Sequence, residues 1–257
     1  MPDKSRWTCT IPEVSLPTFV FGSSTSPLPA GNALALIDAN RPDTHYLTLS
    51  DFRLWSKRVA VGLQKAGLKE GDRVLLFSGN NLFFPALVMG VLMAGGVFTG
   101  ANPTYVAREL AHQLKDSEAK FLLSADGSLE TALEGAKSVG FPKERIYIFD
   151  DEAFEGTGMS RLGAKNWKEL VASQPEGERF EWKEPKNPKD TLCCLNYSSG
   201  TTGVAKGVMI THYNHIANAS QVLYLHTLRA NDAERKKKER FLCCLPVSSL
   251  PVFSIQY

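Results

Sequence analysis

The chain has 257 residues, of which 43% are hydrophobic and 22% are charged, and its formal net charge at pH 7 is +2. These values are those of an ordinary globular protein with one large domain or two small ones. Because the charges nearly cancel, the composition excludes a generally basic surface, and we expect no nucleic-acid partner. Residues 1–21 hold no long apolar stretch, which argues against a secretory signal and for an intracellular protein.

The first half of the chain alternates between helical and extended patterns. Ser50 is predicted to cap a helix whose apolar face repeats every three or four residues and which ends at Gly67, and Thr104 is predicted to cap a later helix. Short apolar runs predict strands over residues 73–77, 97–100, 120–124 and 145–149. The alternation is typical of an α/β fold with mainly parallel sheets flanked by helices.

One stretch is long enough to raise the question of a membrane span. Residues 80–107 carry no charge, and most of them are apolar. Pro85, Gly95, Gly96 and Gly100 interrupt the stretch, however, where a transmembrane helix should be most regular. A buried helix over residues 82–94 that leads into a buried strand accounts for the same residues, so the chain is not expected to be transmembrane.

Composition changes after residue 155. Residues 156–188 are polar and contain three prolines, so apart from a short helix over residues 167–172 they are interpreted as a connecting segment. We therefore divide the chain into a leader with the first strands (1–47), a first α/β subdomain (48–155), a connecting segment (156–190) and the start of a second subdomain (191–257).

The most informative stretch joins two predicted strands, residues 191–196 and 208–210, and a helix over residues 213–228 follows it. Glycines allow close backbone approach to a ligand, successive N–H groups form an anion-binding turn, and hydroxyl groups and a lysine add donors suited to phosphate oxygens. The predicted phosphate-binding residues are Ser198, Ser199, Gly200, Thr201, Thr202, Gly203, Lys206 and Gly207.

This loop is neither a Walker P-loop nor a linker. In a P-loop the lysine precedes Ser or Thr and a helix begins there, whereas here Gly207 and a strand follow Lys206. A Ser/Gly linker would join polar surfaces, not two apolar strands.

At these residues the sequence resembles the adenylate-forming superfamily, which includes acyl-CoA synthetases, 4-coumarate–CoA ligases, luciferases and nonribosomal adenylation domains. Residues 197–214 look like the phosphate-loop signature of that superfamily, although the family usually has Pro where Ala205 stands. Upstream, residues 71–74, 95–98 and 101–105 look like the 4-coumarate–CoA ligase branch. The resemblance covers roughly residues 48–245.

The resemblance implies a two-step reaction of ATP, a carboxylic acid (aryl or fatty) and CoA. The acid and ATP give an acyl-adenylate and pyrophosphate, and the CoA thiol then attacks the adenylate. Lys206 is the implied catalytic residue, because it would stabilise the charge that develops on pyrophosphate. The hydroxyls of Thr201 and Thr202 are implied to lie on the Mg²⁺ side of the phosphates.

The cysteines and histidines are given plainer interpretations. Cys193–Cys194 and Cys243–Cys244 are adjacent pairs in apolar runs, which fits buried thiols in a reducing compartment and not a disulfide framework or a zinc site. His212 is predicted to be a structural or capping residue and not a general base.

The family pattern stops at Val247, and the adenine, ribose and C-terminal motifs of the family do not follow. We interpret the sequence as an N-terminal fragment, from a truncated gene model or a retained intron, and expect it to be inactive and aggregation-prone alone. The alternatives are a non-catalytic nucleotide-binding remnant or regulator, and a nonribosomal-type adenylation domain. The compartment, cytoplasm or peroxisome, the acid and the oligomeric state are left open.

Overall fold

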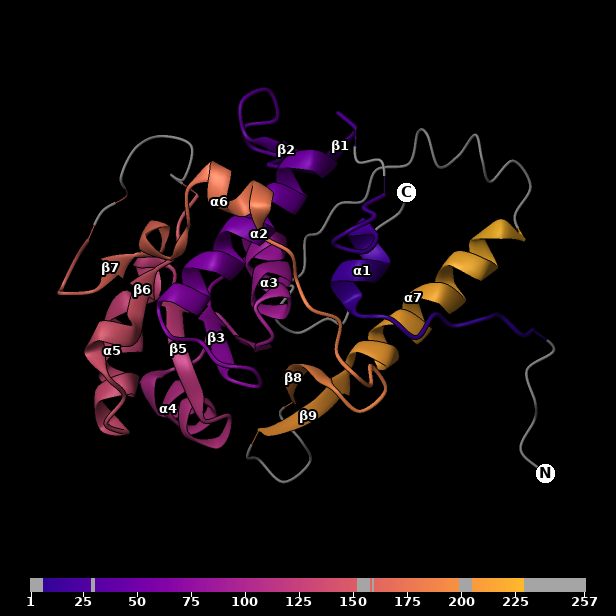
Figure 1. Ribbon diagram of the computed structural model, residues 1–257. Coiled ribbons are helices and arrows are strands. Elements are labelled where there is room, and N and C mark those ends of the chain that lie inside the picture. Colours follow the sequence, from indigo (N-terminus) through magenta and orange to yellow (C-terminus); the bar gives the residue numbers. More distant parts are fainter. Residues whose placement is uncertain (1–6, 29–30, 152–157, 159, 199–204, 229–257) are drawn as a thin grey trace, which may run out of the picture.

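The computed structural model describes residues 7–28, 31–151, 158, 160–198 and 205–228 (Figure 1). Its centre is a seven-stranded sheet with the order β7-β6-β5-β3-β4-β8-β9, in which all neighbours are parallel except the antiparallel pair β8–β9. The mainly parallel α/β sheet predicted from the sequence is therefore confirmed. The strands are β3 (Arg73–Phe77), β4 (Val97–Ala101), β5 (Ala119–Ser124), β6 (Ile146–Ile148), β7 (Lys165–Asn166), β8 (Leu192–Ser198) and β9 (Lys206–Thr211).

Helices cover both faces of this sheet. Because successive side chains of a strand point to opposite faces, Val74 and Leu76 of β3 join the core beneath α2 (Leu49–Lys65) and α3 (Phe84–Met93). Leu75 and Phe77 join a second core, beneath α4 (Ala107–Asp116) and α5 (Leu129–Ser138). Burial on both faces explains why β3 is a continuous apolar run in the sequence, which made its bounds predictable.

The remaining elements lie around this three-layered body. A separate antiparallel pair consists of β1 and β2, and helix α7 leads from the end of β9 away from the sheet (Figure 1). Among the described residues these elements are α1 (Leu16–Phe21), β1 (Leu34–Ile37), β2 (Tyr46–Thr48), α6 (Gln174–Arg179), α7 (His212–Thr227) and the 3-10 helices η1 (Asp126–Ser128), η2 (Lys143–Arg145) and η4 (Trp167–Leu170).

The long uncharged stretch forms a buried helix, as predicted, and then β4. Helix α3 has only ten residues and packs closely on α2, since a Cβ atom at Gly90 would come within 2.6 Å of Val59 Cγ1. Over the part of the chain that the structure describes, no helix combines the length and the apolar character that a membrane crossing requires.

Two predicted helix caps are wrong by a few residues. Thr48 caps α2, because its hydroxyl accepts the Asp51 N–H at 3.1 Å while the Asp51 carboxylate accepts the Thr48 N–H at 3.0 Å. Ser50 therefore lies inside the first turn of α2. Helix α4 begins after Val106, whose N–H donates to Glu109 at 3.0 Å, and Thr104 belongs to the preceding turn. In each case a carboxylate three residues after the observed cap accepts the N–H of the cap residue, which fixes the start of the helix at that residue and not at the predicted one.

The polar segment over residues 156–190 contributes more to the core than its composition suggests. It supplies the edge strand β7 and the 3-10 helix η4, whose Trp167 is fully buried. Strand β8 belongs to the same sheet, so strands that come before and after the predicted connecting segment in the sequence lie together in one sheet. The four-part division of the chain itself stays a prediction.

Candidate phosphate-binding hairpin

The predicted phosphate loop joins the two strands of the β8–β9 hairpin. The antiparallel register pairs Tyr197 with Gly207 and Ser198 with Lys206, so the loop begins and ends at one point of the sheet. Ser198 and Lys206 are exposed there. The predicted residues Ser199, Gly200, Thr201, Thr202 and Gly203 lie outside the described residues.

The sheet places this hairpin end where ligands bind in folds of this kind. Strand β8 runs parallel to β4, with Phe98 beside Cys194 and Gly100 beside Asn196. Ser198 therefore lies at the carboxyl end of β8, and open α/β sheets bind their ligands beyond the carboxyl ends of the parallel strands. The sequence position of the loop and the sheet topology thus point to the same edge.

A buried amide from α4 fixes the register of β4 against β8. The Thr99 hydroxyl donates to the Leu195 carbonyl at 2.8 Å. Gln113 of α4 then donates to Thr99 Oγ1 at 2.9 Å and to the Gly100 carbonyl at 3.1 Å. Both side chains are fully buried, where hydrogen bonds have no competition from water, so α4, β4 and β8 are held as one unit.

Two further side chains of α4 reach the ends of the loop. His112 Nε2 lies 2.9 Å from the Ala205 carbonyl, and because a carbonyl only accepts, Nε2 must carry the proton. Asp116 accepts the Tyr197 hydroxyl at 2.5 Å. Burial, and then the Asp116 carboxylate, raise the pKa of Tyr197 well above its usual range, so it stays a donor.

Sequence reasoning missed both of these contacts with α4. His112 and Asp116 are separated from the loop by about a third of the chain, and nothing in the loop sequence points to them. The available signal was their spacing, because residues four apart on a helix share a face. Gly207 also has a second reason to be glycine, since a Cβ atom there would come within 2.9 Å of Tyr197 Cζ.

The two histidines near the start of α7 have structural surroundings. His212 is 4% exposed, and its Nδ1 accepts the Leu16 N–H at 3.1 Å, which ties α7 to α1. Burial lowers the pKa of His212 to about 4, although Glu184 acts in the opposite direction. The interpretation of His212 as a structural residue agrees with this position. His215 is buried beside Cys193 and Cys194, a grouping that the sequence analysis did not find.

The buried His212 should make stability depend on pH. The ordinary pKa of a histidine is 6.5, so below that pH the unfolded chain binds a proton at His212. In the folded chain the pKa of His212 is about 4, so the proton binds only near that pH. The free energy of unfolding should therefore fall as the pH is lowered through this window, by up to roughly 3 kcal/mol from this residue. Urea denaturation at pH 7 and pH 4.5 measures the loss.

The matched variants isolate the contribution of His212 from that of the carboxylates. His212→Asn keeps an acceptor for Leu16 but does not titrate, so its stability should change less between the two pH values than that of the unmodified chain. His226→Asn, at the other end of α7, should retain the full dependence. Equal pH dependence in all three proteins would contradict the assignment.

The comparisons with known proteins agree with this geometry. A family model described as AMP-binding enzyme matches residues 28–250. An acyl-CoA ligase of Aspergillus niger is 36% identical over 170 residues, which are 66% of this chain and 32% of that protein. A 4-coumarate–CoA ligase-like protein of Arabidopsis thaliana is 34% identical over 179 residues, which are 69% of this chain and 30% of that protein. The chain thus spans about a third of the length of these curated relatives.

The solved structures show the same fold. The luciferase-like enzyme of the mealworm Zophobas morio superposes with a TM-score of 0.71 over 85% of this chain and 47% of its own, at 21% identity. Residues 28–250, which the family model matches, include all seven strands of the central sheet, and the curated relatives are acid–CoA ligases, as the resemblance implied. The chain belongs to the family of AMP-binding enzymes.

Proposed function

We propose that this chain supplies the phosphate-binding part of an ATP-dependent acid–CoA ligase, which joins a carboxylic acid to CoA through an acyl-adenylate. The observation that carries the proposal is the β8–β9 hairpin, which presents Ser198 and Lys206 together at the carboxyl end of the sheet. The loop between them holds the Ser, Gly and Thr residues of a phosphate-binding turn.

The residues at the hairpin suit the charge that the reaction develops. When the carboxylate attacks the α-phosphate, negative charge grows on the pyrophosphate that leaves. The Lys206 ammonium and the hydroxyl of Ser198 would bind its oxygens, together with Ser199 and the loop N–H groups. Positive charge and preorganised donors at that place lower the barrier because they interact more strongly with the transition state than with ATP.

The donor set also fits a magnesium ion. Hydroxyl oxygens, water and phosphate oxygens are the hard ligands that Mg²⁺ takes, and Thr201 and Thr202 offer the first of these. When bound, the ion neutralises phosphate charge. The chain's own contribution is to hold the loop ends, through the contacts of His112 with Ala205 and of Asp116 with Tyr197.

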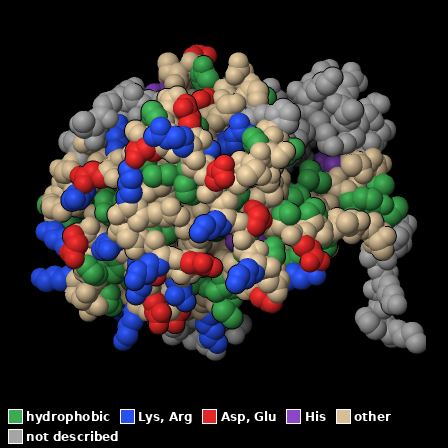
Figure 2. Space-filling view, in the orientation of Figure 1, with side chains coloured by type: hydrophobic (Ala, Val, Ile, Leu, Met, Phe, Trp, Pro, Cys, Tyr) green, Lys and Arg blue, Asp and Glu red, His purple; other side chains and the backbone are tan. Residues whose placement is uncertain are grey.

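Substrates and compartment follow from the same proposal. The acid is of the aryl or fatty class and the second substrate is CoA; the names of the two curated relatives, an acyl-CoA ligase and a 4-coumarate–CoA ligase-like protein, support this choice. No disulfide joins the described cysteines, which supports an intracellular, reducing compartment, either cytoplasm or peroxisome. The surface drawn in Figure 2 mixes positive and negative side chains, in keeping with a small-molecule substrate and no nucleic acid.

The test compares ligands that share only parts of ATP. If the hairpin binds the β- and γ-phosphates, then ATP–Mg²⁺ and pyrophosphate–Mg²⁺ should both raise the melting temperature of the purified chain, because a ligand that binds only the folded state stabilises it. AMP, which lacks those phosphates, should have a much smaller effect. Stabilisation by AMP but not by pyrophosphate would place nucleotide binding elsewhere and contradict the proposal.

A further inference from the structure

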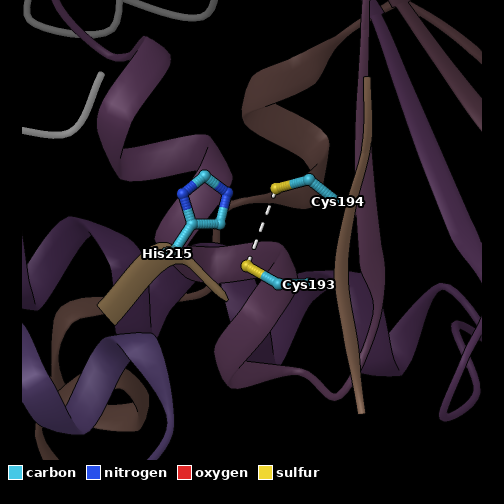
Figure 3. Close-up of side chains that lie close together, drawn as sticks. All are labelled: Cys193, Cys194 and His215. Carbon is cyan, nitrogen blue, oxygen red and sulfur yellow. Dashed lines mark hydrogen bonds between the residues drawn. The ribbon is translucent and has the colours of Figure 1, made fainter. Parts of the chain in front are cut away.

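A compact group of metal-binding side chains lies inside the core, away from the phosphate-binding hairpin. Cys193 and Cys194 of β8 face His215 of the first turns of α7, and the three side chains point toward one another (Figure 3). They are 0%, 3% and 7% exposed. The two sulfur atoms are 3.6 Å apart, and one ligand atom from each residue lies within 4.8 Å of the others.

Local backbone features explain how two adjacent strand residues reach the same place. Neighbouring side chains of a regular strand point to opposite faces. The pairing of β8 with β9, however, shifts register between Leu192 and Cys194, and such irregularities turn a side chain away from its regular direction. The start of α7 is fixed as well, because Thr211 and Asn214 each accept the backbone N–H of the other in a reciprocal capping pair. Asn214 directly precedes His215 in the sequence.

The dimensions of this group match those of a zinc site. Two thiolates bound to one zinc ion at about 2.3 Å, in tetrahedral geometry, are about 3.8 Å apart. The separation of 3.6 Å between the two sulfur atoms is close to that value without any rearrangement of the strand. Two sulfur ligands with one imidazole nitrogen are also a ligand set that zinc takes when a water molecule fills the fourth position.

Charge selects among the metals that bind sulfur. The site is buried, so an uncompensated charge would be costly there. Two thiolates and a neutral imidazole carry a net charge of −2, which Zn²⁺ cancels, whereas Cu⁺ would leave a negative charge in the core. Mg²⁺ and Ca²⁺ prefer oxygen ligands and do not match two sulfur atoms.

We propose that Cys193, Cys194 and His215 bind a zinc ion, which fastens the start of α7 to β8. The binding step releases the thiol protons, because the thiolate and not the thiol is the ligand. The role is independent of phosphate binding, since the residues come before the loop on β8 and after it on α7 and none of them is at the hairpin end.

The experiment uses the whole chain, reduced and freed of metal, with Zn²⁺ titrated against a coloured competing chelator. One zinc ion per chain is expected. Titration with Co²⁺ in place of Zn²⁺ should produce a thiolate-to-cobalt charge-transfer band and the intense visible bands of a tetrahedral ion. This spectrum tests the proposal in the unmodified chain, so it does not depend on whether any variant folds.

Variants assign the ligands. Cys193→Ser, Cys194→Ser and His215→Asn should each weaken Zn²⁺ binding by about tenfold or more. Substitution of a residue that only orients a metal ligand already lowers metal affinity by about tenfold, and loss of a ligand itself should cost at least as much. The controls are the double variant Cys243→Ser/Cys244→Ser and the single variant His226→Asn, which should bind as the unmodified chain does. A cobalt spectrum without thiolate charge transfer, or loss of binding in the Cys243/Cys244 variant, would overturn the proposal.

Discussion

Replacing Lys206 with alanine should weaken the binding of ATP–Mg²⁺ to this chain by roughly 10- to 100-fold. The side chain is exposed at the first position of β9, directly opposite Ser198, and we propose that it binds phosphate oxygens. A hydrogen bond to a charged group contributes about 1.5–3 kcal/mol, and each 1.4 kcal/mol corresponds to a factor of about ten in the dissociation constant. Equilibrium dialysis of ATP–Mg²⁺ measures the change.

Two matched variants show whether the effect belongs to this position. Lys206→Arg keeps the charge but not the compact ammonium, and should recover part of the affinity. Lys120→Ala removes another exposed lysine, on β5, and should leave binding unchanged. If Lys120→Ala weakened binding as much as Lys206→Ala, a general loss of positive charge would explain the result and the specific role of Lys206 would be wrong.

Replacing Trp167 with alanine should lower the free energy of unfolding by about 3–5 kcal/mol, the range for removal of a large buried aromatic side chain. Trp167 is fully buried, and its ring centroid lies 4.9 Å from that of Phe149 and 5.5 Å from that of Phe83. Its Nε1 also donates to the Asp150 carbonyl at 3.0 Å, so the variant would leave that acceptor without this donor. Urea denaturation followed by far-ultraviolet circular dichroism measures the change.

The comparison for this variant is Trp7→Ala. Trp7 has the same side chain but is 42% exposed, so its removal should cost far less than that of Trp167. Trp167→Phe should lie between, because it keeps most of the apolar volume and loses the hydrogen bond. A similar small loss for Trp7→Ala and Trp167→Ala would show that the 3-10 helix η4 does not contribute to the cooperative core.

These positions also show how far sequence reasoning reaches. The bounds of β3 were predicted correctly because a strand buried on both faces leaves a short, continuous apolar run in the sequence. Trp167 was predicted to begin a short helix, but that helix was assigned to a connecting segment, because the polar composition of residues 156–190 describes the exposed neighbours and conceals the buried rings of Trp167 and Trp182. The average composition of a segment does not show which of its individual side chains point into the core.

The candidate site was predictable to a similar degree. Ser198 and Lys206 could be named as candidates because the loop is continuous in sequence. His112 and Asp116 could not, since their contacts with the hairpin exist only after β4 and β8 have paired. The cysteine pair was judged against the spacing of zinc motifs within one segment, whereas His215 reaches it from a different element, across the hairpin.

The position of α4 has a thermodynamic consequence. One side of this helix packs Leu110 and Leu114 into the core, and the side chains of His112 and Asp116 contact the two ends of the loop. If the packing of α4 stabilises the hairpin conformation that binds a ligand, then ligand binding stabilises α4 by the same free energy, because coupling between two sites is reciprocal. Substitutions in the apolar face of α4, which is not part of the phosphate-binding hairpin, should therefore also change the affinity for nucleotide. Selection on the stability of α4 then acts on nucleotide affinity as well, and the reverse also holds.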